Sequence, residues 1–550
     1  MFGKRGERMT WIALVGPEVE ENLSLRYVSS SLMTAGYRTE ILPFNIDQDF
    51  PRVARDILGA DEPPVLVGLS LAFQWRAHDF LALAMALRQG GYEGHITCGG
   101  HFATFCWREL LTEYAELDTV CRFEAEYTIV DLVQTLIDGR PYEQVAGLGL
   151  RRDGKPALTP PRALPDLKTL PFPDRRGSPA LCFGHKVAPL VSSRGCYANC
   201  SFCCIAAWQE KGLPGKRYRL RTVEDVADEM VEDQRRRGTD IFIFQDDNFF
   251  VPSAKRNLAR INDLADALEA RGIGKFATVV KARPPDVRED VFEALVNRLN
   301  CIRAYVGIET DTDTGNATLT RLVTPAENRE AMRIVRKLGL YVCFNLLIFD
   351  PDTTPDHLEQ NLKFMELFAD YPFGIARVEL YAGTPLLTRM QAEGRCTGNW
   401  IDRNYTLGTP EMERIFQSSF YCLRSRHHGD SPSMIEVMLL RFDIEACAYF
   451  HPEVFQESWR DEAIALTRVL TGNTVSTLRS INERIAGGAP AKGDRAFANA
   501  LRETCFERNA EISDGAAELA ARIGETTGNA ASLTEVRRLY RMTPDAQVAK

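Results

Sequence analysis

The feature that most constrains this chain is a cysteine-rich run at residues 194–204, RGCYANCSFCC. Cys196, Cys200 and Cys203 stand in a C-x3-C-x2-C spacing. Three thiolates this close in sequence can surround one metal centre, and thiolate is the ligand that iron–sulfur clusters prefer. The alternative is three unrelated core cysteines, which would require the neighbouring Tyr, Asn and Ser to be buried as well. The spacing therefore predicts a [4Fe-4S] cluster with one iron left open to a cofactor or substrate.

The cysteine motif resembles that of the radical S-adenosylmethionine (SAM) superfamily, in which an aromatic residue directly precedes the third cysteine. Phe202 holds that place here. In the superfamily the open iron chelates the amino and carboxylate groups of SAM, and the aromatic ring packs near the adenine. Cys204 falls outside the motif, so the resemblance implies a structural role for it.

Strand-like and helix-like segments alternate through the first 146 residues. Continuous apolar runs that end in Gly, Ser or Pro are typical of parallel strands buried on both faces. This alternation predicts a doubly wound, Rossmann-like α/β domain at 1–146, with ligands at the carboxyl ends of its strands. The expected strands are residues 10–16, 37–43, 65–72, 95–98 and 119–123.

The strand ends resemble the cobalamin (B12)-binding domain of B12-dependent radical SAM enzymes, through VGLS at 67–70, CGGHFAT at 98–104 and EAEYT at 124–128. Residues 123–126 read FEAE where that family often has G-E-G-E. The D-x-H-x-x-G motif, which supplies an axial histidine, is absent from the sequence. The resemblance therefore implies cobalamin bound base-off and without a histidine ligand. The implied cobalamin contacts are Gly16, Ser70, Leu71, Gln74, Trp75, Gly99, Gly100, His101 and Glu124.

Three further units follow the first domain. Residues 147–184 are rich in Pro and Gly and predict a linker with one short hairpin around Asp153. Residues 185–398 contain about six β/α units, which predict a partial (β/α)6 TIM-like barrel with catalytic groups at the carboxyl ends of its strands. Residues 399–550 have helical periodicity and predict a helical C-terminal domain, which we expect to cap the barrel mouth.

Polar residues follow several of the expected barrel strands. Gln245, Asp246 and Asp247 come directly after the apolar run IFIF, and Lys281 and Glu309 stand at two later strand ends. A carboxylate in such a place can pair with an ammonium group in a dry site. The radical SAM resemblance implies that the acidic stretch receives the SAM amino group and that Glu309 contacts the ribose hydroxyls. It also implies that Lys281 binds the SAM carboxylate or the substrate.

Charge and composition limit the class of partner. The net charge is −9 and the pI is near 5.6, so no global positive field favours nucleic acid. We find no apolar run of membrane-spanning length and no signal-peptide pattern. The fourteen cysteines do not have the pattern of a secreted disulfide framework. We therefore expect a cytoplasmic protein with no nucleic-acid or membrane partner. The radical SAM resemblance implies a small-molecule or peptide substrate and an external flavodoxin-like or ferredoxin-like electron donor.

The resemblance implies a cobalamin-dependent radical SAM methyltransferase acting on an unactivated centre, carbon or phosphinate phosphorus, of a natural product or peptide. No single residue is identified as catalytic. Oxidative cyclisation and ring contraction stay open, because no motif separates them from methylation. A methylthiotransferase would need three more cysteines; Cys98, Cys106 and Cys121 exist, but at spacings unlike that family's. The last alternative is a non-enzymatic cobalamin or redox sensor. Such a sensor would not need acidic residues at the ends of the barrel strands.

Replacing Cys196, Cys200 and Cys203 together with Ala should abolish the iron–sulfur absorbance of the anaerobically reconstituted protein, because the motif thiolates are gone. Cys204→Ala is the matched control and should retain about four irons per chain. Visible spectroscopy with iron and sulfide analysis measures both proteins. A triple variant that still forms a SAM-cleaving cluster would contradict the ligand assignment.

Overall fold

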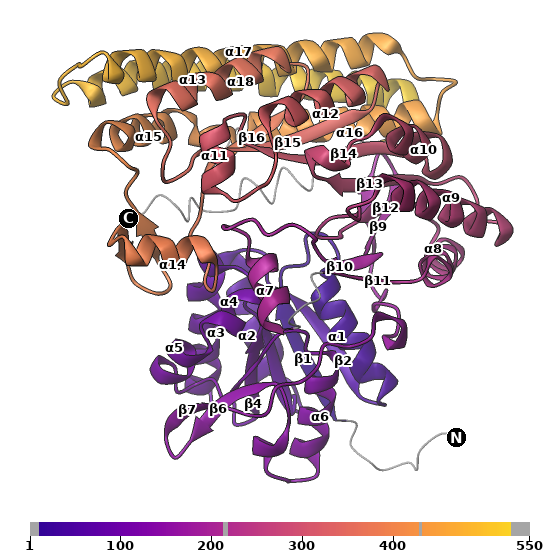
Figure 1. Ribbon diagram of the computed structural model, residues 1–550. Helices are drawn as coiled ribbons and strands as arrows, with labels where there is room; N and C mark the ends of the chain where they lie inside the picture. The colour runs from indigo at the N-terminus through magenta and orange to yellow at the C-terminus, as the bar shows by residue number, and fades with distance from the viewer. Residues whose placement is uncertain (1–9, 213–217, 428–431, 530–550) are drawn as a thin grey trace.

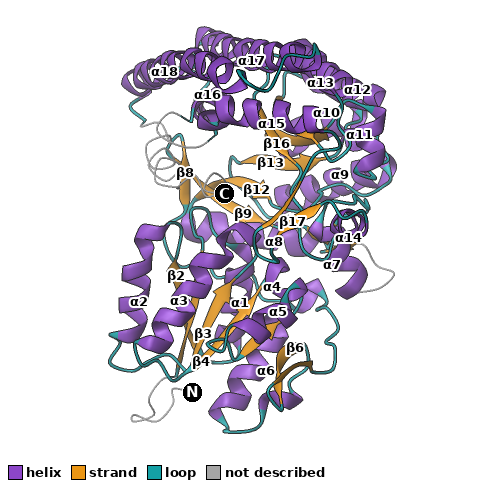
Figure 2. Ribbon diagram, turned by 90° about the vertical axis from the view of Figure 1, so that its left-hand side faces the viewer, coloured by secondary structure: helices purple, strands orange, loops and turns teal. Residues whose placement is uncertain are grey.

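A computed structural model describes residues 10–212, 218–427 and 432–529 of the chain. Within these residues there are two large sheets of seven strands each, together with a layer of long C-terminal helices. Figure 1 shows the N-terminal sheet below, and the second sheet with the long helices above it. Figure 2, turned by 90°, shows the same sequence of layers.

The N-terminal sheet has the strand order β2-β1-β3-β4-β5-β6-β7. The strands are β1 (Trp11–Gly16), β2 (Arg38–Pro43), β3 (Leu66–Ser70), β4 (His95–Gly99) and β5 (Thr119–Cys121), followed by β6 (Leu148–Arg152) and β7 (Lys155–Leu158). The first five are parallel, and the order reverses between β1 and β3. The predicted doubly wound domain is thus confirmed, and its ligand crevice is expected at the carboxyl ends of β1 and β3.

Helices cover both faces of this sheet because successive residues of a strand point to opposite sides. Ile12 and Leu14 of β1 share one core cluster with Leu25 and Ile129, whereas Ala13 belongs to the cluster on the other face. The short helices α2, α4 and α5 are not predicted from the sequence. The helices are α1 (Leu23–Thr34), α2 (Phe50–Leu58), α3 (Ala77–Gln89), α4 (His101–Phe105), α5 (Trp107–Glu113) and α6 (Glu126–Ile137).

Both ends of the segment 147–184, expected as a linker, take part in the sheets. The predicted hairpin around Asp153 is present as β6 and β7, and β6 pairs antiparallel with β5. Asp153 has a φ of 52°, the left-handed conformation that a tight hairpin turn uses. At the other end, β8 (Ala180–Cys182) pairs antiparallel with the first barrel strand. The connection between the two sheets is therefore shorter than the composition predicts.

The second sheet has the order β16-β15-β14-β13-β12-β9-β8, in which the strands from β9 to β16 are parallel. This arrangement confirms the predicted partial barrel. The parallel strands are β9 (His185–Leu190), β12 (Thr239–Phe244), β13 (Ala277–Ala282), β14 (Cys301–Glu309), β15 (Tyr341–Phe349) and β16 (Phe373–Arg377). The helices between and after them are α8 (Val223–Arg237), α9 (Ala254–Ala270), α10 (Glu289–Leu299), α11 (Asp313–Thr318), α12 (Pro325–Lys337), α13 (Pro355–Leu367) and α14 (Pro385–Ala392).

Shorter elements complete the barrel region. Between β9 and α8 lie β10 (Ser193–Gly195), α7 (Cys204–Gly212) and β11 (Tyr218–Leu220), and β10 pairs antiparallel with β11. After α14, a small hairpin is formed by β17 (Cys396–Gly398) and β18 (Arg403–Tyr405).

The C-terminal layer consists of α15 (Pro410–Leu423), α16 (Ser433–Phe450), α17 (Glu457–Ala486) and α18 (Asp494–Thr527). One of these helices, α16, packs against the inner face of the barrel: Phe442 shares a core cluster with Ile241 and Tyr341, near the beginnings of their strands. The Tyr341 hydroxyl donates to the Met438 carbonyl oxygen at 2.8 Å. We expect a cap on the barrel mouth, but α16 closes the opposite end. It is buried on most of its surface, as a helix inside a lumen must be.

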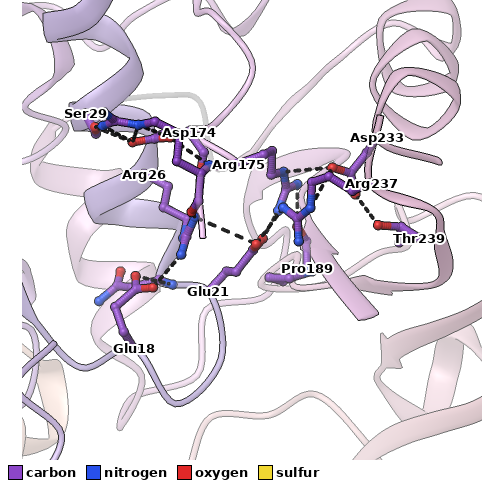
Figure 3. A network of polar contacts seen from close by, with 12 residues as sticks. Glu18, Glu21, Arg26, Ser29, Asp174, Arg175, Pro189, Asp233, Arg237 and Thr239 are labelled. Carbon is purple, nitrogen blue, oxygen red and sulfur yellow. Dashed lines mark hydrogen bonds and ion pairs between the residues drawn. The ribbon is translucent and has the colours of Figure 1, made fainter. Parts of the chain in front are cut away.

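A network of buried ion pairs joins the N-terminal domain to the barrel (Figure 3). Arg175, in the connecting segment, pairs with Glu21 of the β1–α1 loop and, at 2.8 Å, with Glu229 of α8. Arg237 of α8 also reaches Glu21, at 2.6 Å. The side chains of Glu21 and Glu229 are 3% exposed. Separating the two domains would therefore leave buried charges without partners, which is strongly unfavourable.

Arg175→Met should lower the melting temperature by several degrees, because removing one partner of a buried ion pair costs about 3–5 kcal/mol. Arg333→Met is the matched control: Arg333 pairs with Glu330 at 2.7 Å, but its side chain is 56% exposed. Its loss should leave the melting temperature close to that of the parent, because an exposed ion pair contributes little to stability. Differential scanning calorimetry compares the two variants, and equal melting temperatures would contradict a role for Arg175 in holding the domains together.

Candidate functional site

The three motif cysteines lie on the loop between β10 and α7 and face one cavity. Cys196, Cys200 and Cys203 all line this cavity, which has a volume of about 680 Å³. We call it the cysteine cavity. It reaches the carboxyl ends of the barrel strands, since residues at the ends of β12, β13 and β14 also line it. Cys204, at the start of α7, does not.

The chemistry of this loop fits an iron–sulfur cluster better than a single metal ion. Among the described residues, no three His, Cys, Asp or Glu side chains converge as a single ion requires. A cubane cluster binds each thiolate at a different iron, so separate thiols around one cavity suit it. Burial raises the pKa of the Cys196 thiol to about 11, so metal binding must displace its proton. Arg283 and Arg321 line the same cavity and can offset the negative charge of thiolates.

The two adjacent acids after β12 have different surroundings. Asp246 has no exposed surface and does not line the cysteine cavity. Its carboxylate accepts hydrogen bonds from the Ser192 amide at 3.1 Å, from the Ser192 hydroxyl at 2.7 Å and from the Ser193 hydroxyl. Asp247 does line the cavity and accepts from the Gly195 amide at 2.8 Å. Asp246 thus braces the strand before the cysteines, and Asp247 is the acid of the pair that a ligand can reach.

Four other residues expected to bind SAM line the cysteine cavity: Phe202, Gln245, Lys281 and Glu309. Lys281 donates its ammonium to Gln245 Oε1. Burial lowers the pKa of Lys281, and the carboxylate of Asp247 acts in the opposite direction. An anionic group entering the cavity would therefore find a partly desolvated cation at Lys281.

The inward-facing residues of β14 form a column along the cavity. Arg303, Tyr305, Gly307 and Glu309 alternate along the strand and all line the cavity. Glu309 ends the strand with a φ of 61°, and its carboxylate lies 3.3 Å from the Arg321 guanidinium. Only Glu309 is predicted from the sequence, although the alternating pattern R-x-Y-x-G-x-E is the signal that identifies the others.

The N-terminal domain also contributes to the cysteine cavity, through the β1–α1 loop. Val19, Glu20 and Glu21 of this loop line the cavity. The Gln245 side-chain amide lies 3.4 Å from a Glu20 carboxylate oxygen. These residues are not predicted from the sequence, but the acidic run PEVEEN directly after β1 is a signal of the kind that strand ends carry.

The cobalamin residues predicted at strand ends lie together and are not among the residues that line the cysteine cavity. Ser70 pairs in register with Gly99, and a Cβ on Gly16 would lie 2.9 Å from the Cβ of Ser70. Gly100 has a φ of 105°, and a Cβ there would lie 2.8 Å from the neighbouring backbone. Leu71 is 1% exposed and belongs to the core. Three adjacent strands thus end in small residues, which fits close approach by a large flat ligand.

Two other predicted cobalamin residues instead bind side chains of the other domain. Gln74 accepts a hydrogen bond from Arg403 at 2.7 Å, and Glu124 pairs with Arg194 at 2.6 Å. Trp75 is 44% exposed, so it does not have the core-packing role that an indole side chain commonly has.

An aromatic contact covers the remaining predicted residue, His101. Its ring lies 4.5 Å from the ring of Trp208 in α7, and burial lowers the pKa of His101 to about 4. Trp208 also meets Phe123, with ring centroids 5.2 Å apart. Phe123 has a φ of 60°, a conformation that favours glycine, and it stands where the resembling family often has glycine. Packing on Trp208 offsets the strain of a bulky residue there.

Two family models match the chain. The B12 binding domain matches residues 10–133, and the Radical SAM superfamily matches residues 190–365. The first match contains the strand ends Ser70 and Gly99, and the second contains the motif cysteines. The chain is a cobalamin-dependent radical SAM enzyme. Its cofactors are accordingly a [4Fe-4S] cluster, SAM and cobalamin.

Several known proteins are similar to this enzyme over part of its length. It is 27% identical over 67% of its length to an uncharacterised methyltransferase of Pyrococcus horikoshii, of which it covers 77%. It is 28% identical over 62% of its length to the hopanoid C-3 methylase of Methylococcus capsulatus, of which it covers 63%. The solved structure of the cobalamin-dependent SAM radical enzyme OxsB, with aqua-cobalamin and SAM bound, matches with a TM-score of 0.66 at 17% identity. That match covers 97% of this chain and 83% of OxsB.

Asp247→Asn should weaken SAM binding to the reconstituted enzyme by about tenfold or more, because a hydrogen bond to a charged group is worth roughly 1.5–3 kcal/mol. Equilibrium dialysis with labelled SAM measures the affinity. Asp246→Asn is the matched comparison: it should lower the melting temperature, since Asp246 holds Ser192 and Ser193. Unchanged SAM affinity in an Asp247→Asn protein that keeps its cluster would contradict the proposed role.

Proposed function

We propose that this enzyme is a methyltransferase that transfers a methyl group to an unactivated centre, carbon or phosphinate phosphorus, of a natural product or peptide. The methyltransferase and methylase names of its relatives in Pyrococcus horikoshii and Methylococcus capsulatus support this proposal. The observation that carries it is the composition of the cysteine cavity, to which both domains contribute. Radical methylation needs the products of two cofactors at one substrate, and a cavity bounded by both domains allows this.

The proposed roles follow from the side chains that border the cavity. When bound, the cluster with SAM supplies a carbon radical, and cobalamin supplies a methyl group. Cys196, Cys200 and Cys203 hold the cluster at the carboxyl ends of the barrel strands. Asp247 accepts hydrogen bonds from the SAM ammonium, and Glu309 accepts them from the ribose hydroxyls. The buried walls exclude water, which strengthens these contacts and protects reactive species.

The lining of the cavity gives the other predicted SAM residues their roles. Phe202 packs near the adenine. Gln245 holds the ammonium of Lys281 by the hydrogen bond already described. Lys281 then presents its cation to a carboxylate of SAM or of the substrate.

For cobalamin, we propose binding at the carboxyl ends of β1, β3 and β4, base-off and without a histidine ligand. Gly16, Ser70 and Gly99 end these strands and let a macrocycle approach the backbone. His101, which follows Gly100 after β4, has its ring packed against Trp208, which supports binding without this histidine as a ligand. Exposed Trp75 is free of core packing and is the proposed contact to the lower face of the corrin.

Cyclisation is the second candidate reaction. The anaerobic magnesium-protoporphyrin IX monomethyl ester cyclase of Cereibacter sphaeroides is 24% identical to this chain over 53% of its length. A methylthiotransferase is disfavoured, because Cys98, Cys106 and Cys121 are buried, whereas the three motif cysteines are partly exposed. A sensor without turnover would form no 5′-deoxyadenosine, so the experiment below also tests the sensor hypothesis.

The proposal includes a small-molecule or peptide substrate and an external electron donor of the flavodoxin or ferredoxin kind. The cytoplasmic location and the absence of a nucleic-acid partner stay predictions. None of the described helices combines the length and hydropathy that a bilayer span needs.

Turnover with reductant and SAM carrying a deuterated methyl group should place the label in the product. Each methylated product should be accompanied by one S-adenosylhomocysteine, from recharging of cobalamin, and one 5′-deoxyadenosine, from hydrogen abstraction. Liquid chromatography with mass spectrometry measures all three species. The triple Cys→Ala variant is the control and should form none of them.

An unlabelled product formed together with 5′-deoxyadenosine would reject methyl transfer and favour cyclisation or ring contraction. Binding of both cofactors without any 5′-deoxyadenosine would favour the sensor. Comparison of metabolites between a deletion strain and its parent is the direct route to candidate substrates for this experiment.

A further inference from the structure

The column of inward-facing residues on β14 ends in a buried cation. Arg303 stands six residues before Glu309, a distance of roughly 20 Å along a strand that rises about 3.3 Å per residue. It lines the cysteine cavity and is 5% exposed. Arg303 is therefore at the deep end of the cavity, near the start of the strand, whereas Glu309 and the motif cysteines lie at the other end.

Aromatic rings surround the Arg303 guanidinium. Its central carbon lies 4.4 Å from the ring centre of Tyr305, 5.4 Å from that of Tyr341 and 4.8 Å from that of Phe442. Phe442 belongs to α16, so this cage joins the barrel to the C-terminal layer. Cation–π contacts stabilise a desolvated cation, but they offset only part of the cost of burying a charge.

The hydrogen bonds of Arg303 are unlike those of the other buried arginines. Its one hydrogen-bond acceptor among the described residues is the Cys343 sulfur, at 3.4 Å, and its Nε has none. No carboxylate of the described residues forms an ion pair with it; Asp443, which also lines the cavity, has other contacts. Within the part of the chain that the structure describes, the other six buried arginines all donate to oxygen atoms: Arg26, Arg76, Arg221, Arg321, Arg426 and Arg441.

We infer that Arg303 binds an anionic group of the substrate, a carboxylate or a phosphate, at the deep end of the cysteine cavity. A planar guanidinium with free N–H donors matches either group by paired hydrogen bonds. The cavity lining also includes Val279, the register partner of Arg303 on β13, and Met438 and Leu439 of α16, which suit an apolar body. The inference rests on the proposed function, since it takes this cavity as the place where the substrate binds.

This placement orients the substrate. With its anion held at Arg303, the opposite end of the molecule points along β14 toward Glu309 and the cysteine loop. Only groups remote from the anion then come near SAM. The depth of Arg303 thus selects both the charge of the substrate and the position on it that reacts.

The test measures binding rather than turnover, with three probes that share a phenyl body. These are phenylacetate, phenyl phosphate and the neutral phenylacetamide, titrated calorimetrically into the anaerobic holoenzyme. At least one anion should bind about tenfold tighter than the amide, because a charge-assisted pair replaces an unpaired buried cation. The two anionic probes separate a carboxylate site from a phosphate site. Equal affinity for all three probes in the unmodified enzyme would overturn the inference without any variant.

Arg303→Met should remove the preference for the anion, with about a tenfold loss of anion affinity and little change for the amide. Arg303→Lys keeps the charge and should keep the preference in weaker form, which also covers the case in which the Met variant does not fold. Arg377→Met is the matched control. Arg377 packs 3.9 Å from the ring of Tyr405 and lies outside the cavity, so its loss should leave all three affinities unchanged.

The inference is wrong if the folded Arg303→Met protein binds the anions as tightly as the parent does. Because this test measures binding and the test of the proposed function measures methyl transfer, either proposal can fail without the other. An anion preference that depends on Arg303, found in an enzyme that transfers no labelled methyl group, would keep the site and reject the reaction. A labelled product from an enzyme without anion preference would do the reverse.

Discussion

The ion pairs of Arg175 determine how the two domains of this enzyme face each other. Arg175 belongs to neither sheet, yet it binds Glu21 from the β1–α1 loop and Glu229 from α8. Glu20, the neighbour of Glu21 in the chain, lines the cysteine cavity. The electrostatic cost of separating these groups therefore fixes a wall of the cavity as well as the arrangement of the domains. A site built from two domains needs a constraint of this kind, because contacts between domains otherwise permit relative motion.

Much of the fold is predictable, because the barrel strands and helices carry strong local signals. The mostly apolar run at residues 341–349 forms β15, and Thr222 and Gly238 cap the two ends of α8. In both cases hydrophobic pattern and capping residues act within a few residues of one another. The place of α16 is not predictable in this way. Its sequence shows that most of its surface is buried, but periodicity does not say which surface covers it, and it enters the lumen rather than covering the mouth.

The candidate site shows the same division between local and long-range information. The cysteine spacing is a local property, and all three motif cysteines line one cavity. Nothing in the sequence distinguishes Asp246 from Asp247 as a ligand for SAM. In an extended chain, however, adjacent side chains point to opposite sides. Only one of them can reach the cavity, and the contacts of Ser192 and Ser193 decide which. Among the residues predicted to bind cobalamin, Gly100 is a glycine because its own turn has a positive φ and leaves no room for a Cβ. The turn alone therefore explains this glycine, and the sequence pattern cannot show whether it also contacts a ligand.

Because α16 rather than the barrel forms the floor of the lumen, the enzyme has two parts that can diverge independently. The ends of the barrel strands hold the groups that any radical SAM reaction needs, and changes there would harm every substrate alike. Phe442, Met438 and Leu439 belong to a separate helix, so substitutions on α16 can deepen, shorten or recharge the chamber while the cluster loop stays intact.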